Sequence, residues 1–101
     1  MKLQTTQKIK ELDGQDSKML SVGKAIANIV LMVKSDPLRS YLMATKLYQE
    51  NEIELSKADY EWIKTAITEH GHEVYSNALV SGQLLLILSE LKEEEKQTIT
   101  K

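Results

Sequence analysis

Two apolar runs decide the fold of this chain: Ala25-Ile26-Ala27-Asn28-Ile29-Val30-Leu31-Met32-Val33 and Leu84-Leu85-Leu86-Ile87-Leu88. A surface helix carries an apolar stripe and a polar face, whereas a helix that is apolar all round has to be covered on every side. A domain of 101 residues has little interior in which to cover two such helices. We therefore expect part of the cover to come from a second copy of the chain or from another protein.

Length and composition indicate one domain over residues 1–101. Apolar residues make up 42% and charged residues 28%, as in ordinary soluble domains, and the 4 Gly and 1 Pro favour long helices. Because Cys is absent, there is no disulfide framework and no thiolate zinc site. The first residues lack a secretory signal, and the longest apolar run has nine residues. A membrane span needs about 20, so we expect a cytoplasmic protein without a membrane partner.

Helical periodicity begins after residue 20. Ser21 is a suitable N-cap for a first helix that ends near Lys34. Asp36 is expected to cap a second helix, with Pro37 at its first position, where the missing N–H costs nothing. One face of this second helix carries Leu38, Tyr41, Leu42, Thr45 and Tyr48.

A third helix is predicted from Lys57 to His70. Ser56 and Asp59 match the capping pattern in which the Ser side chain and the acidic residue satisfy backbone N–H groups. Gly71 is expected to end the helix in the left-handed conformation.

A fourth helix is predicted from Asn77 to Lys96, which completes a helical core over residues 21–96. The acidic residues 93–95 oppose the helix dipole, so we expect a mobile tail at residues 97–101. The sequence therefore predicts a mainly α, four-helix domain.

Residues 1–20 lack helical periodicity and allow two interpretations. Apolar and polar residues alternate before Asp13-Gly14, a strong tight-turn signal, so strands near residues 3–11 and 16–20 can form a hairpin. The other interpretation is a disordered arm, because two strands alone are marginal in water. A hairpin would make the fold class α+β.

The charge of −2 is unevenly distributed and disfavours nucleic acid as the main partner. Residues 1–50 carry 8 basic and 5 acidic side chains, whereas residues 51–101 carry 5 and 10. Phosphate binding depends on a basic surface. A helix-turn-helix would use residues 57–70 as its recognition helix, where Asp59, Glu61 and Glu69 would face phosphates. A small DNA-binding regulator is therefore an alternative, not the leading hypothesis.

Catalytic, metal and cofactor sites have little support. Glu69, His70, His72 and Glu73 form the one cluster with metal-ligand chemistry, but two His across a Gly do not define a tetrahedral set. No Ser lies in a nucleophile elbow, and the isolated Gly residues make no phosphate-binding loop. We expect no enzyme activity, no catalytic residues, no metal and no cofactor.

A protein interface on the fourth helix is the preferred functional interpretation. Its candidate residues are Val80, Leu84, Leu85, Leu88 and Leu91, and Trp62 on the flank of the third helix is a further candidate. Trp is a common interface anchor, and Gly82 would let another backbone approach closely. The alternative is a central helix covered by its own chain, with Trp62 in ordinary core packing.

Several stretches carry a family resemblance: Leu12-Asp13-Gly14, Leu20-Ser21-Val22-Gly23-Lys24-Ala25-Ile26, Tyr41-Leu42-Met43-Ala44-Thr45-Lys46-Leu47-Tyr48, Ile53-Glu54-Leu55-Ser56 and Leu79-Val80-Ser81-Gly82-Gln83. In this order the chain resembles small, mostly uncharacterised proteins encoded by tailed bacteriophages and prophages. The resemblance covers most of the chain but contains no chemical motif. It implies a protein made in the bacterial host cytoplasm that acts by stoichiometric binding.

The leading hypothesis is a non-enzymatic protein-protein interaction module that forms homodimers or larger assemblies. Its partner is expected to be another copy, a further protein, or both. An assembly factor and an inhibitor of a host protein both fit this description. A virion structural component is the second alternative, after the DNA-binding regulator.

Overall fold

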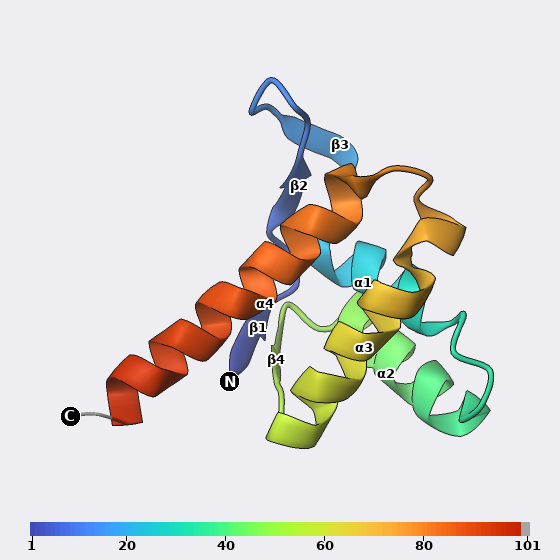
Figure 1. The fold of residues 1–101 in the computed structure, drawn as a ribbon, viewed down its shortest axis with the longest axis vertical. Helices are drawn as coiled ribbons and strands as arrows, with labels where there is room; N and C mark the ends of the chain where they lie inside the picture. The colour runs from blue at the N-terminus through green and yellow to red at the C-terminus, as the bar shows by residue number, and fades with distance from the viewer. Residues whose placement is uncertain (100–101) are drawn as a thin grey trace.

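The computed structural model describes residues 1–99, apart from the side chains at positions 19 and 94–99. Four helices and four short strands follow one another along the chain (Figure 1). They are β1 (Lys2–Gln4), β2 (Lys8–Lys10), β3 (Asp16–Ser21), α1 (Val22–Val30), α2 (Pro37–Gln49), β4 (Glu52–Glu54), α3 (Lys57–Val74) and α4 (Ala78–Ile99). The chain is thus mainly helical with short antiparallel strands, as an α+β class requires.

The N-terminal segment forms a hairpin, which decides between the two interpretations of residues 1–20. Strands β2 and β3 pair antiparallel, with Lys8 opposite Ser21 and Lys10 opposite Asp16. Gly14 has a φ of +85°, the left-handed conformation that its tight turn requires.

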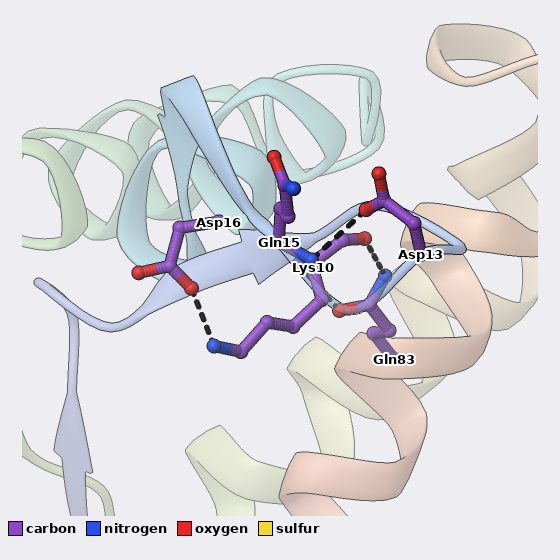
Figure 2. Close-up of polar contacts among 5 residues, drawn as sticks. All are labelled: Lys10, Asp13, Gln15, Asp16 and Gln83. Atoms are coloured by element: carbon purple, nitrogen blue, oxygen red, sulfur yellow. Dashed lines mark hydrogen bonds and ion pairs between the residues drawn. The ribbon is translucent and has the colours of Figure 1, made fainter.

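The hairpin is attached to α4 through one side chain (Figure 2). The Gln83 amide nitrogen donates to the Lys10 carbonyl at 2.6 Å, and the Lys10 N–H donates to the Gln83 side-chain oxygen at 2.8 Å. The Lys10 ammonium also pairs with Asp16 across the hairpin. Gln83 therefore satisfies both backbone groups of Lys10, at the edge of β2.

Strand β1 does not extend the hairpin but pairs with β4, which lies between α2 and α3. The antiparallel register places Lys2 opposite Glu54 and Leu3 opposite Ile53. Leu3 and Ile53 are both buried in the core. Nothing local in the sequence of β4 indicates a partner some fifty residues away.

Helix α1 lies at the centre of the molecule and is covered by its own chain. It packs against α2 on one side and α3 on the other, and α3 in turn packs against α4. Its apolar side chains are buried. A side chain on Gly23 would come within 2.3 Å of the Leu47 carbonyl oxygen, so the helix lies very close to α2. The chain itself therefore covers the apolar residues of α1, whereas Leu31 of the same run is exposed, and the helix ends at Val30, short of the predicted Lys34.

Helix α3 begins as predicted, but the prediction for Gly71 is wrong. The Ser56 side chain accepts from the Asp59 N–H at 3.0 Å. The helix then continues through Gly71 to Val74, and Gly71 is buried inside it. A Cβ at position 71 would lie 2.3 Å from Ser81 Oγ. Glycine at position 71 thus lets α4 approach α3 closely. Sequence alone does not reveal this role, because it depends on a helix that is distant in the chain.

Helix α4 begins after Asn77, whose side chain accepts from the Leu79 N–H at 2.9 Å. It continues to Ile99, so the first three positions of the expected tail are helical. Residues 100–101 lie outside the described residues, and the mobility of residues 97–101 stays a prediction. In Figure 1 the C-terminal half of α4 extends away from the other helices.

Candidate interaction surface

Helix α2 has apolar side chains on two opposite faces, and only one of them is buried. Met43, Ala44 and Leu47 point into the core beside the buried Ser40. The face predicted from the sequence points outward: Leu38 is 68%, Tyr41 63%, Leu42 53% and Tyr48 61% exposed. Together with the half-buried Thr45, these four residues are called the α2 face.

Two shallow depressions flank the α2 face, and Tyr41 and Thr45 line both of them. One, of about 650 Å³, extends over Leu42 toward Lys46 and Asp59. The other, of about 300 Å³, lies between α2 and α1 and includes the half-exposed Leu31. The exposed apolar surface is therefore continuous from α2 to the end of α1. Large exposed apolar patches mark binding sites more often than scattered single residues do.

Charged groups of both signs border the α2 face. Asp36 caps the helix by accepting from the Arg39 N–H at 3.3 Å. Arg39 pairs with Asp59 at 3.2 Å, and its guanidinium lies 4.6 Å from the centroid of the Trp62 ring. Lys46 is exposed on the same depression. Around the depression over Leu42 two acidic and two basic groups therefore balance, and Lys24 adds a third basic group beside Tyr48.

Trp62 is half-buried beneath Arg39. This cation–π contact covers one face of the indole, and the salt bridge to Asp59 holds the guanidinium in place. The ring packs against the hydrophobic core. Trp62, on α3 as the sequence predicted, thus lies near the border of the α2 face.

Three of the residues proposed from sequence for an interface on α4 belong to the core. Val80 is 8%, Leu84 0% and Leu88 1% exposed within the single chain. A partner cannot reach these side chains unless the fold opens, so they are corrected to core residues. Their burial follows from the packing of α4 on α3.

The outer side of α4 retains some apolar surface. Leu85 and Leu91 are partly buried, and Leu86 is 59% exposed. No atom lies within 4 Å of the Cβ position of Gly82, so nothing within the described part of the chain requires glycine there. A contact through Leu85 and Leu91 stays a prediction.

The buried Tyr60 is the residue with the clearest electrostatic perturbation. Its hydroxyl donates to the Leu88 carbonyl oxygen at 3.0 Å and joins α3 to α4. Burial, and secondarily the neighbouring Glu61, raise the pKa of Tyr60 above 10.0. The phenol stays protonated, so its role is structural.

His70 forms local contacts with two acidic residues of α3. His70 Nδ1 contacts the Glu73 carboxylate, and its Nε2 lies 4.0 Å from Glu69. Among the side chains that the structure describes, no group of three or more His, Cys, Asp or Glu is arranged to hold a metal ion. Ser81 Oγ is buried without a hydrogen-bond partner, but it faces Gly71 inside the α3–α4 contact.

The sequence places the residues of the α2 face on one side of the helix but does not reveal that this side is exposed. Leu38, Tyr41, Leu42 and Thr45 have the spacing of an apolar stripe, which normally faces the core. The residues at positions 40, 43, 44 and 47 face the core in their place. The sequence does carry a signal for an exposed apolar face, namely two apolar stripes on one short helix. Only one of the two stripes can be buried in the same domain.

Comparison with models of protein families, with curated proteins and with solved structures found no match for this chain. Within residues 1–99, no helix is both long enough and apolar enough to cross a membrane.

Proposed function

We propose that this protein is a non-enzymatic interaction module that binds another protein stoichiometrically through the α2 face. The observation that carries the proposal is the exposure of four large side chains, Leu38, Tyr41, Leu42 and Tyr48, on successive turns of one helix. Monomeric soluble proteins rarely expose contiguous apolar patches of this kind without a binding role.

The driving force of binding is the removal of apolar surface from water, worth roughly 25 cal/mol per Å². Tyr41 and Tyr48 suit this role because a tyrosine offers a large rigid ring and a hydroxyl that can stay solvated. Lys24 lies 5.5 Å from the centroid of the Tyr48 ring and limits its freedom. Ordered side chains lose less entropy on binding.

In the bacteriophage setting that the sequence resemblance implies, such a module would serve as an assembly factor or as an inhibitor of a host protein. Both roles need binding without chemistry. The proposal shifts the contact from α4 to α2, since three of the α4 candidates are core residues.

The test places a charge at the centre of the α2 face. Leu42→Glu should abolish association, and Leu86→Glu is the matched control, because Leu86 is an equally exposed leucine on α4. Association is measured by light scattering behind size exclusion for self-binding, and by 1:1 co-purification with a partner for heterologous binding. Circular dichroism verifies that both variants fold.

The proposal is supported if Leu42→Glu loses the complex while Leu86→Glu keeps it. If Leu86→Glu loses the complex and Leu42→Glu keeps it, the contact lies on α4 and the assignment to α2 is wrong. If neither variant alters association, the α2 face is not a binding surface.

A further inference from the structure

We infer that the occupant of the α2 face is the α2 helix of a second copy, packed antiparallel about a two-fold axis between Tyr41 and Leu42. This inference rests on the proposed function and names its partner. Three features of the described residues support it: the spacing of the apolar side chains, the arrangement of the bordering charges and the direction of the helix.

The central apolar cluster is self-complementary. Leu38, Tyr41, Leu42 and Thr45 follow the i, i+3, i+4, i+7 pattern, which is symmetric about its midpoint. An antiparallel copy therefore sets Leu38 opposite the partner's Thr45, and Tyr41 opposite the partner's Leu42. Each large side chain meets a smaller one. A two-fold interface requires the same patch to match itself in this way.

The bordering charges favour the antiparallel arrangement over the parallel one. Asp36 and Lys46 line the same depression of the α2 face. Antiparallel packing about the proposed axis brings Asp36 within about one residue of the level of the partner's Lys46, about 1.5 Å along the helix. Parallel packing would set Asp36 against the partner's Asp36, and Lys46 against the partner's Lys46, and like charges repel.

Two further properties agree with a second copy as the occupant. Arg39 is already paired with Asp59, so the border beside Leu42 offers no excess charge to attract a strongly acidic or basic partner. Antiparallel helices also align their dipoles favourably. One helix face is smaller than the 20–30 residues per side of a standard interface, so we expect a dimer with a dissociation constant of about micromolar order.

Disulfide trapping tests both the partner and its orientation, because the chain has no native Cys. Leu42→Cys lies beside the two-fold axis and should form a covalent dimer on mild oxidation. Leu38→Cys alone should not, because the partner's Leu38 lies about 10 Å further along the helix. A mixture of Leu38→Cys and Thr45→Cys should give the mixed dimer. Leu86→Cys, equally exposed on α4, is the control for random collision.

A charge reversal supplies an independent measurement. Lys46→Glu places an acidic side chain near the partner's Asp36, and the two-fold axis repeats this repulsion. The substitution should therefore raise the dissociation constant of the dimer about three- to tenfold at low salt. Lys64→Glu, an exposed lysine on α3, is the matched control and should leave the constant unchanged. Analytical ultracentrifugation over a concentration series measures both.

The failures of the two proposals can be told apart. Self-crosslinking of Leu38→Cys as well as Leu42→Cys, without that of Leu86→Cys, would show parallel packing, and equal trapping of all variants including Leu86→Cys would show random collision. Either result overturns the antiparallel dimer. If the wild type stays a monomer at millimolar concentration while Leu42→Glu still abolishes a 1:1 complex with another protein, the dimer is wrong and the binding function stands. If Leu42→Glu alters no complex of any kind, both fall.

Discussion

At the scale of single residues, two long-range contacts of α3 fix how α4 packs on it. The Tyr60 hydroxyl bonds the Leu88 carbonyl, and Gly71 leaves room for Ser81. Both residues look ordinary in the sequence: a tyrosine in a stripe and a glycine near a helix end. Their roles arise only from the neighbouring helix, which sequence periodicity does not place.

Tyr60 should make stability depend on pH in the alkaline range. Because burial raises its pKa above 10.0, the folded protein keeps the phenol proton at pH values where the unfolded chain loses it. The contribution of Tyr60 to the free energy of unfolding is complete below pH 10 and is lost as the pH rises through the pKa of the folded state. Tyr60→Phe should remove this part of the alkaline decline and cost about 0.5–1.5 kcal/mol at neutral pH through the lost hydrogen bond.

Urea unfolding of both proteins between pH 8 and 11 measures the effect. The two stability curves should converge toward high pH. Parallel curves over the whole range would contradict a perturbed Tyr60.

The two helical glycines should respond in opposite directions to alanine. Gly71→Ala should destabilise the fold by about 1–3 kcal/mol, because its Cβ would meet Ser81 Oγ at 2.3 Å. Gly82→Ala should stabilise it by about 0.5–1 kcal/mol, because the space there is open and alanine favours the helix. Adding Ser81→Ala to Gly71→Ala should recover part of the loss. Thermal unfolding measures all three, and a stabilised Gly71→Ala would argue against the close α3–α4 packing.

At the scale of elements, the chain is held together by side chains that satisfy exposed backbone groups. Gln83 does so for β2, just as Ser21, Asp36 and Ser56 do for the first N–H groups of their helices. These contacts differ in the sequence separation that they bridge, since each cap bonds a residue three positions on, whereas Gln83 joins two distant segments.

Replacing Gln83 should loosen the hairpin while leaving the helices intact. Gln83→Ala removes both bonds to the Lys10 backbone and should cost about 1–2 kcal/mol. Gln83→Glu keeps the acceptor for the Lys10 N–H but turns a carboxylate oxygen toward the Lys10 carbonyl oxygen, so it should not preserve the attachment. Amide hydrogen exchange at Lys10 measures the opening directly. Unchanged protection of Lys10 in Gln83→Ala would mean that the hairpin is held by other contacts.

This difference in sequence separation also explains how much of the fold the sequence predicts. The three helix caps and the turn at Gly14 are confirmed, because each depends on neighbours within a few residues. The β1–β4 pairing was missed, because three-residue strands carry almost no periodic signal and their partners are distant. The residues of the α2 face were named correctly, but their exposure depends on which of two stripes α1 covers.

At the scale of the whole molecule, the helices form a series in which α1 packs between α2 and α3, and α4 packs on the far side of α3. In Figure 1 α2 therefore lies at one edge of the molecule, away from most of α4. An edge helix has one side without neighbours from its own chain. The position of α2 in this series leaves its outer stripe accessible, and the interior position of α1 removes the need for outside cover that its sequence suggested.

The pairing of β1 with β4 also affects how the chain folds as it is synthesised. Leu3 leaves the ribosome early, but its partner Ile53 is added fifty residues later. At about 5–20 residues per second, the apolar face of β1 waits roughly 3–10 s for its place in the core. During that interval the nascent chain carries an unpaired strand, so the sheet that β1 and β4 form cannot assemble before about half of the chain has been made.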